Sequence, residues 1–310
     1  MSTATPSAPE RKSLQTPWGD LTVRDAHVHF FSHRFFSLLT GGRDVAEVAA
    51  QLEWEAPAAE PELLADRWVT ELDRHGVTSA AIIASMPGDE ESVARAVARH
   101  PARLHGQFLL NPLAPDAAAR LQSAFAAGLH TVCLFPAMHR YSVADERLEP
   151  LWPLAAGRNV FVHCGVLSVG VRKRLGLPSP FDMRFSNPLD LHNVALRHPG
   201  VRFVIPHFGA GFFREALMLA DLCSNVYLDT SSSNNWTRYA AGAPDLEAVF
   251  RQALAVAGPR RLLFGTDSSF FPRGWVHPVF AAQTEVLARI GVNRADAAAI
   301  LGETLLSLQQ

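Results

Sequence analysis

VRDAHVHF (residues 23–30) is the stretch that decides how this chain of 310 residues folds and where its chemistry lies. Side chains two residues apart do not face each other on a helix, but on a strand they point to the same face. Apolar residues surround the two histidines and a turn-like WGD segment precedes the run, so we expect 21–30 to form a strand. His27 and His29 would then point to one side and could meet the same metal ion.

Three further apolar runs, each closing on a polar residue and then Gly or Ser, occur later in the chain. They are NVFVHCG (159–165), VRFVIPHFG (201–209) and RLLFGTDS (261–268), which carry His163, His207 and Asp267. Continuous apolar runs are typical of parallel strands that helices cover on both faces. A polar ligand at the carboxyl end of several such strands is how a barrel of alternating strands and helices builds its active site.

The order of elements along the chain favours an α/β fold with a single (β/α)8 TIM barrel, whose metal site lies at the C-terminal ends of the strands. Besides the runs above, we expect strands at 77–84, 104–110, 131–135 and 225–230, and helices at 61–75, 90–100, 116–127, 148–157, 189–197, 212–222, 246–256, 278–290 and 294–308. A doubly wound sheet is the rival, but it usually shows a glycine-rich turn after its first strand, and this chain has none. The long segments 31–60 and 167–187 should form loops at the catalytic face.

Composition bounds the domain organisation and the partners. The chain is 48% hydrophobic and 19% charged, which suits one large domain as well as two small ones, and the barrel pattern favours one domain at 19–310. We expect 1–18 to be a flexible tail rather than a signal peptide, because it has no apolar core. A net charge of −2 gives no reason to expect nucleic acid or an anionic membrane surface, and no apolar run approaches the length of a membrane span. Cys133, Cys164 and Cys223 have no paired spacing, which fits a reducing cytoplasm.

A set of three histidines and one aspartate favours Zn²⁺, although Mn²⁺, Fe²⁺, Co²⁺ and Ni²⁺ also accept such ligands. The chain has 13 histidines, so most of the others are expected to have structural rather than metal-binding roles. We expect helix ends for His75, His100 and His198, strand starts for His105 and His130, and catalytic-face loops for His139, His192 and His277. Arg34, Arg184, Arg238 and Arg273 are expected on solvated surface, with one of them a candidate carboxylate anchor. Asp229 either supports a metal ligand or caps a turn.

The motifs together resemble those of the amidohydrolase superfamily. DAHVH at 25–29, FVH at 161–163, PHFG at 206–209 and FGTDS at 264–268 are similar to its motifs on strands one, five, six and eight, and ILGETLL at 300–306 resembles the C-terminal helix of its second branch. That branch contains aminocarboxymuconate-semialdehyde decarboxylase, related aromatic-acid decarboxylases, and lactone and amide hydrolases. The resemblance spans 21–308.

The resemblance implies roles for the candidate residues. His27, His29, His163 and Asp267 match the ligands of one metal ion, and His207 matches the histidine that orients or deprotonates the water. Asp267 would also shuttle a proton. Binuclear relatives carry a carboxylated lysine on strand four, whereas this chain has TVCLF at 131–135, so we expect one metal. Cys133 or Cys164 could reach the site, and a thiolate ligand would weaken that expectation.

Three functions remain open at this stage. The first is hydrolysis of a small cyclic amide, lactone or ester by metal-activated water, and the second is non-oxidative decarboxylation of an unsaturated or aromatic acid. The third is a silent barrel that serves as a binding protein. Aromatic residues that follow strands one and eight either face a ring-shaped or carboxylate-bearing substrate or pack the loops; they are Phe30, Phe31, Phe35, Phe36, Phe270, Phe271 and Trp275. A homodimer is the general expectation for a soluble enzyme.

Overall fold

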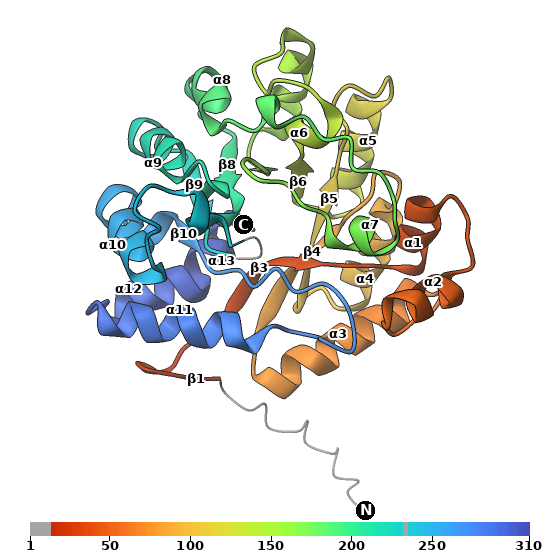
Figure 1. The fold of residues 1–310 in the computed structure, drawn as a ribbon, viewed down its shortest axis with the longest axis horizontal. Coiled ribbons are helices and arrows are strands. Elements are labelled where there is room, and N and C mark those ends of the chain that lie inside the picture. Colours follow the sequence, from red (N-terminus) through yellow and green to blue (C-terminus); the bar gives the residue numbers. More distant parts are fainter. Residues whose placement is uncertain (1–13, 232–234) are drawn as a thin grey trace, which may run out of the picture.

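A single sheet of eight parallel strands forms the centre of the molecule in the computed structural model, which describes residues 14–231 and 235–310. The strands pair in the order in which they follow one another along the chain, from the first to the last. They are β3 (Arg24–His29), β4 (Ser79–Ala84), β5 (Leu104–Leu109), β6 (Thr131–Leu134), β7 (Asn159–Val162), β8 (Arg202–Ile205), β9 (Val226–Asp229) and β10 (Leu262–Leu263). Figure 1 shows helices arranged around these strands.

The sheet closes where the last strand meets the first. The amide of Ala26 donates to the carbonyl of Phe264 at 2.8 Å, and the amide of His29 donates to the carbonyl of Ser268 at 2.7 Å. Val28 and Ser268 form a parallel bridge at the same seam. Eight strands joined edge to edge in chain order, with helices between them, make the TIM barrel that the sequence predicted.

Side chains inside and outside the barrel form separate apolar clusters. The interior cluster includes Ala26, Ile83, Cys133, Phe161 and Val204, one from each of five strands. The larger cluster lies between the outer faces of the strands and the helices, where β-strand residues alternate with those inside. Burial on both faces explains why the strands read as continuous apolar runs.

Local signals place the helices between the strands. α3 (Pro61–His75) begins with proline at its first turn and ends at Gly76, whose φ of 71° gives the left-handed cap. α10 (Leu246–Ala257) begins at Asp245, whose carboxylate accepts from the amide of Ala248. The other helices are α1 (His33–Thr40), α2 (Val45–Leu52), α4 (Glu90–Arg99), α5 (Ala117–Ala126), α6 (Pro136–His139), α7 (Gly170–Arg174), α8 (His192–Arg197), α9 (Phe213–Leu222), α11 (His277–Arg289), α12 (Arg294–Ala298) and α13 (Thr304–Leu308).

Three predicted helices differ from the structure. The helix expected at 189–197 begins as a 3₁₀ turn, η4 (Pro188–Leu191), and is α-helical only in α8. The helix expected at 148–157 is a pair of 3₁₀ turns, η1 (Glu146–Leu151) and η2 (Pro153–Ala155), because Pro150 and Pro153 cannot donate backbone hydrogen bonds. The closing helix expected at 294–308 is interrupted by a π turn between α12 and α13, η8 (Ala299–Glu303).

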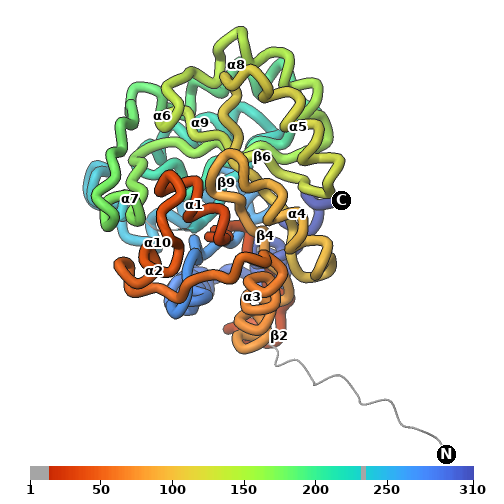
Figure 2. The backbone as a smooth tube through the Cα atoms, turned by 90° about the vertical axis from the view of Figure 1, so that its right-hand side faces the viewer, coloured from red at the N-terminus to blue at the C-terminus, as the bar shows by residue number. Residues whose placement is uncertain are grey.

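The two long loops cover one end of the barrel. The segment 31–60 contains α1 and α2, and the segment 167–187 contains α7. Their apolar side chains, among them Phe36, Val48 and Val171, form a third cluster of their own. Figure 2 shows α1, α2 and α7 on the same side of the molecule, away from the C-terminus. A lid of small helices therefore lies over the carboxyl ends of the strands.

The start of the chain is described only in part. The predicted tail at 1–18 lies outside the described residues up to residue 13, and its last residues form the first strand of a hairpin of β1 (Gln15–Thr16) and β2 (Gly19–Asp20). The indole of Trp18 donates to the carbonyl of Val292 at 2.7 Å, which holds this hairpin against the barrel. No helix within the described ranges is long and apolar enough to cross a membrane.

Candidate metal centre

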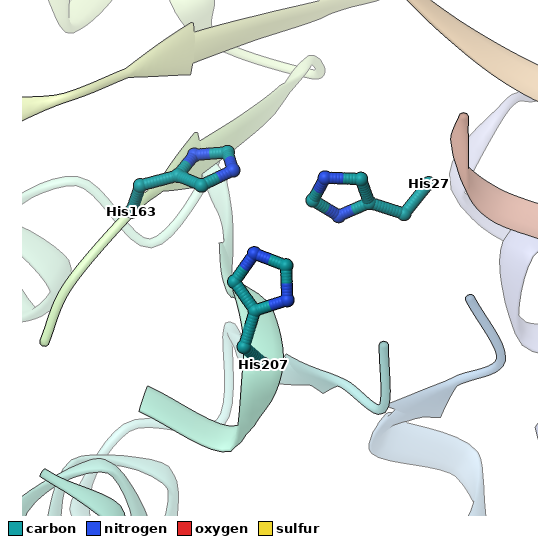
Figure 3. Close-up of side chains that lie close together, drawn as sticks. All are labelled: His27, His163 and His207. Atoms are coloured by element: carbon teal, nitrogen blue, oxygen red, sulfur yellow. The ribbon is translucent and has the colours of Figure 1, made fainter. Parts of the chain in front are cut away.

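Barrel closure brings the five candidate residues into one cluster. His27 and His29 lie on β3, His163 follows β7, His207 lies in η5 (Pro206–Gly209) after β8, and Asp267 follows β10. Ring nitrogens of His27, His163 and His207 lie within 4.8 Å of one another, and the same limit holds for His27, His29 and Asp267. Figure 3 shows the first three rings turned toward a common centre. The Nε2 atoms of His29 and His27 lie 3.0 and 3.7 Å from Asp267 Oδ1.

Unusual backbone conformations turn two of these side chains inward. His207 and Asp267 have φ of 56° and 58°, in the left-handed region that residues other than glycine seldom adopt. The amide of Asp267 donates to the carbonyl of His27 at 2.9 Å, which holds it against β3. Strain of this kind collects at functional sites, where the surrounding structure enforces it.

Glycine in two of the motifs is required by close packing. A Cβ at Gly265 would lie 2.8 Å from Asp229 Oδ1 and 3.0 Å from the Cβ of His27. A Cβ at Gly165 would lie 2.2 Å from the carbonyls of Gly209 and Ala210. Each glycine therefore lets neighbouring strand ends approach closely enough to bring the site together.

Buried ring nitrogens without a protein partner mark the centre of the cluster. His27 Nε2 and both ring nitrogens of His163 are enclosed and meet no hydrogen-bond partner in the part of the chain that the structure describes. Buried polar atoms are nearly always satisfied, so such atoms indicate a missing ligand. Imidazole nitrogens beside a carboxylate are the donor set of a divalent transition metal, so these residues fit such an ion.

Hydrogen bonds on the far side of the rings set their orientation. His27 Nδ1 lies 2.6 Å from Asp229 Oδ2, and a carboxylate can only accept, so Nδ1 carries a proton and Nε2 faces the cluster. The amide of Ser231 donates to the other oxygen of Asp229 at 2.6 Å. Asp229 therefore contacts His27 and also closes a turn through the amide of Ser231, and its support of a metal ligand stays a prediction.

Ser231 links two histidines of the cluster. Its carbonyl lies 3.1 Å from His207 Nδ1, and its Oγ lies 2.9 Å from the same nitrogen and 3.3 Å from His27 Nδ1. Because a carbonyl only accepts, His207 holds its proton on Nδ1 and presents Nε2 as an acceptor. Residues 232–234, which follow Ser231 in the chain, lie outside the described ranges.

Asp25, the first residue of the DAHVH motif, has a structural role that the sequence did not suggest. Its carboxylate accepts from the hydroxyl of Thr266 at 2.5 Å, from the indole of Trp275 at 2.8 Å and from the amides of His27 and Thr266. Burial raises the pKa of Asp25 to about 6, against the lowering effect of these bonds. Asp25 thus joins β3 to the loop that carries Asp267.

The protonation states of most of the cluster favour the binding of a cation. Burial lowers the pKa of His163 and of His207, so both rings are neutral near pH 7. Burial acts to lower the pKa of His27, but the Asp229 carboxylate raises it to about 9, so the ring favours a positive charge, proton or metal, at Nε2. Burial acts to raise the pKa of Asp267, but the neighbouring histidines hold it well below its usual range.

Neither cysteine considered as a ligand lies among these groups. Cys133 donates from Sγ to Gln107 Oε1 at 3.3 Å, and burial raises its thiol pKa far above the usual range. Cys164 donates to the carbonyl of Val162 at 3.4 Å, and burial raises its thiol pKa in the same way. Both are therefore neutral thiols, and no ligand group within the described ranges contains either one.

The histidines that were expected at helix ends lie there. His100, His198 and His75 lie at helix ends beside carboxylates, at 2.5 Å from Asp66, 3.2 Å from Glu149 and 3.2 Å from Glu71. His139, His192 and His277 were expected in or near catalytic-face loops; they lie at ends of α6, α8 and α11, and none of them lines the cavity beside the cluster.

A cavity of about 550 Å³ opens beside the cluster and is lined by His29, His163, His207 and Asp267. One wall is a column of stacked side chains. The distances between neighbouring centres are 4.2 Å for Phe35 and Phe31, 5.9 Å for Phe31 and Trp54, 3.9 Å for Trp54 and Phe270, and 4.5 Å for Phe270 and the guanidinium of Arg273. The aromatic residues of the column therefore line the cavity. The other aromatic residues considered from the sequence, Phe30, Phe36, Phe271 and Trp275, do not line it.

Of the four arginines considered as anchors, only Arg273 lines this cavity. Its Nη2 donates to the carbonyl of Asp267 at 3.1 Å and to Ser269 Oγ at 2.7 Å, and no acceptor in the described chain contacts its Nε or Nη1. Arg184 pairs with Asp182 at 2.6 Å, away from the cavity. Arg34 and Arg238 bond to Gly88 and Tyr239.

Comparison with known proteins bears on this geometry. Residues 25–304 match the family model described as Amidohydrolase. Among curated proteins, the chain is 36% identical to protein fluG of Emericella nidulans over 87 residues, which is 28% of this chain and 10% of that protein. The chain thus spans about a tenth of the curated relative that it matches.

Solved structures of low sequence identity share the fold. A probable 2-pyrone-4,6-dicarboxylic acid hydrolase from Acinetobacter baumannii with citric acid bound is 14% identical, with a TM-score of 0.60 over 93% of this chain and 99% of that one. An amidohydrolase from Burkholderia multivorans with bound zinc is 17% identical, with a TM-score of 0.60 over the same shares. A 5-carboxyvanillate decarboxylase from Novosphingobium aromaticivorans with bound manganese is 12% identical, with a TM-score of 0.59 over 97% and 98%.

The family match covers nearly the whole barrel, from the DAHVH motif on β3 to the start of α13, and includes every residue of the cluster. The solved structures add the same architecture in proteins that carry zinc or manganese. On this evidence the chain belongs to the amidohydrolase family.

Proposed function

We propose that this protein is a metal-dependent hydrolase that opens a small cyclic amide, lactone or ester with metal-activated water. The observation that carries the proposal is the convergence of buried, unpartnered ring nitrogens with the Asp267 carboxylate beside a cavity large enough for a small ring. Members of the family are enzymes, hydrolases or decarboxylases, so both reactions come from one kind of site.

His27, His29, His163 and Asp267 would hold one divalent ion. Zn²⁺ suits this set of nitrogen and oxygen donors best, and Mn²⁺, Fe²⁺, Co²⁺ and Ni²⁺ remain alternatives. Neutral thiols at Cys133 and Cys164 support a single ion without a sulfur ligand. When bound, the ion supplies Lewis-acid chemistry, which makes a water more acidic and polarises a carbonyl.

Asp267 and His207 would handle the protons. His207 presents Nε2 as an acceptor, because its Nδ1–H is held by the carbonyl of Ser231, so it suits the orientation of an attacking water better than donation to an oxyanion. Asp267 is ionised and lies at the mouth of the cluster, so its carboxylate can accept the proton of that water and deliver it to the leaving nitrogen or oxygen.

The cavity supports a planar, carboxylate-bearing substrate. The column of Phe31, Trp54 and Phe270 offers flat apolar surface beside the ligand set. Arg273 ends this column, and its Nε and Nη1 meet no protein acceptor in the described chain, so its positive charge and a free N–H can hold a carboxylate. We therefore place the ring against the column and its acid group at Arg273.

Decarboxylation of an unsaturated or aromatic acid is the second candidate, and the same features favour it. The ion would then hold the carboxylate that is lost, and Asp267 or His207 would first take up a proton from water and then deliver it to the carbon that the carboxylate leaves. The manganese-containing decarboxylase of the same fold supports this candidate, but only at the level of architecture, because it is 12% identical to this chain.

Elemental analysis of protein purified without added metal or chelator, paired with the Asp267→Ala variant, tests the proposal first. About one equivalent of a transition metal in the native protein and less in the variant is the expected result. No metal in either sample, even after reconstitution, would favour the silent barrel over both enzymes.

Turnover assays on the metal-loaded protein then separate the two reactions. A panel of cyclic amides, lactones, esters and unsaturated acids is followed by product analysis and by release of CO₂. Ring opening without CO₂ supports the hydrolase, whereas CO₂ release from an acid supports the decarboxylase. Metal content with no turnover across the panel would argue for a binding protein.

A further inference from the structure

One histidine of the ligand set is supported by a residue that no motif identifies. His29 Nδ1 lies 2.7 Å from the Oγ of Ser85, the residue that follows β4. The same Oγ lies 3.1 Å from the carbonyl of Ile83. That carbonyl also accepts from the amide of Phe30 at 2.9 Å, so it is fixed in the seam between β3 and β4.

Counting protons gives the direction of each bond. A serine hydroxyl has one proton, and a carbonyl oxygen can only accept, so the hydroxyl of Ser85 donates to Ile83. The Oγ must then accept from His29, which places a proton on Nδ1. Nε2 of His29, which lies 3.0 Å from Asp267 Oδ1, is thereby the ring atom available to a metal ion.

We propose that Ser85 is a positioning residue that holds His29 in its Nδ1–H form and aims Nε2 at the metal ion. This inference rests on the proposed function, because it assigns His29 to the ligand set. A histidine that binds a metal commonly donates its other N–H to a fixed acceptor, and loss of that acceptor weakens binding.

Two neighbouring histidines have the same kind of contact at Nδ1 as His29 has with Ser85. Asp229 accepts from Nδ1 of His27, and the carbonyl of Ser231 accepts from Nδ1 of His207. Ser85 supplies the same contact to His29 through a neutral hydroxyl whose own proton is already committed to Ile83. Three rings, two on β3 and one in η5, are therefore turned with Nε2 toward a common region.

The position of Ser85 also places it next to the substrate. Both Ser85 and His29 line the cavity of about 550 Å³, whereas Asp229 is completely buried behind His27. Water can therefore reach the Nδ1 side of His29 when the hydroxyl is removed, and the ring gains freedom to rotate. We expect a loss of metal affinity rather than a loss of fold.

The test compares Ser85→Ala and Ser85→Thr with Ser79→Ala. Ser79 begins the same strand at the other end of the barrel, and its buried hydroxyl has no partner in the described chain, so it controls for the same substitution without the contact. The affinity of each full-length protein for Zn²⁺ is measured by competition with a chelator. Ser85→Ala should lose about tenfold to a hundredfold, whereas Ser85→Thr and Ser79→Ala should stay within about twofold of the native protein.

A second readout reports on the ring itself. In zinc-loaded protein with isotope-labelled histidine, the Nδ1–H proton of His29 should exchange slowly with water in the native protein and in Ser85→Thr. It should exchange rapidly in Ser85→Ala and remain slow in Ser79→Ala. Unchanged zinc affinity and unchanged exchange in Ser85→Ala would overturn the proposal, as would a native protein that binds no zinc.

The outcome is distinguishable from that of the proposed function. Loss of zinc affinity in Ser85→Ala with no turnover by the native protein would leave the positioning role intact and remove the hydrolase. Turnover by the native protein with unchanged zinc affinity in Ser85→Ala would support the enzyme and remove the positioning role of Ser85.

Discussion

The two halves of the candidate metal centre differ in how they are held. The side chains of His27 and Asp229 are both fully buried and joined at 2.6 Å, so a carboxylate fixes one ligand out of reach of solvent. His29 and Asp267 keep 20% and 14% of their side-chain surface exposed, and a neutral serine supports His29. We infer that the buried half would fix the ion, and that the open half, which also offers ligands, would let substrate and protons reach it.

This difference predicts that the buried half controls metal binding outright. His27→Ala removes the nitrogen shared by both ligand groups and leaves Asp229 buried without its partner, so we expect metal content to fall below detection. Elemental analysis measures it. His100→Ala, which alters a histidine beside Asp66 at a helix end, should keep about one equivalent. Full metal content in His27→Ala would contradict the division into two halves.

The open half is expected to control turnover without controlling the fold. Asp267→Asn keeps the size of the side chain but cannot accept a proton as a carboxylate does, so kcat should fall by about a hundredfold to ten-thousandfold. The melting temperature should change little. Asp245→Asn serves as the matched control, because asparagine caps α10 as well as aspartate does. A fully active Asp267→Asn variant would remove the proton shuttle from the mechanism.

The contrast between the halves also explains how far sequence reasoning reached. Alternation along one strand placed His27 and His29 on the same face, and strand-terminal positions identified His163, His207 and Asp267, because both are local patterns. Barrel closure could be inferred from the order of elements. Those patterns concern the backbone path, which periodicity and turn residues reveal.

Contacts between distant strands were beyond the same reasoning. Ser85 and Ser231 support histidines 56 and 24 residues away, and serine carries no spacing signal of its own. Asp25 stood in a quoted motif, yet its bonds to Thr266 and Trp275 exist only after the last strand meets the first. The misplaced helix at 148–157 had a local signal, because Pro150 and Pro153 disfavour a continuous α-helix.

Arg273 lines the cavity beside the open half and is expected to affect substrate binding rather than metal binding. Arg273→Ala removes a positive charge and N–H donors from the cavity wall, so KM for a carboxylate substrate should rise about tenfold to a hundredfold, the equivalent of about 1.5–3 kcal/mol for bonds to a charged group. Metal content should not change. Arg273→Lys should recover only part of the loss, because an ammonium keeps the charge but lacks the planar group that lies over the Phe270 ring. Steady-state kinetics on acid and neutral versions of one substrate measure the effect.

The control for this variant is Arg184→Ala, since Arg184 pairs with Asp182 away from the cavity. Equal losses in the two variants would mean that the net charge of the rim matters and not the place of Arg273. Equal KM values for the acid and neutral substrates in the native protein would remove the anchor altogether.

Substitution of Cys133, inside the barrel, should give the smallest effect on metal binding, and it tests the buried half. Its thiol donates to Gln107, which in turn donates to the carbonyl of Ala26, next to His27. A serine hydroxyl can make the same donation, so Cys133→Ser should keep metal stoichiometry near one and change zinc affinity by less than about twofold. Elemental analysis beside Cys223→Ser, a buried thiol outside the barrel interior, measures it. A fall in stoichiometry confined to Cys133→Ser would make the thiol a ligand, and the buried half would then bind its ion through sulfur as well as nitrogen.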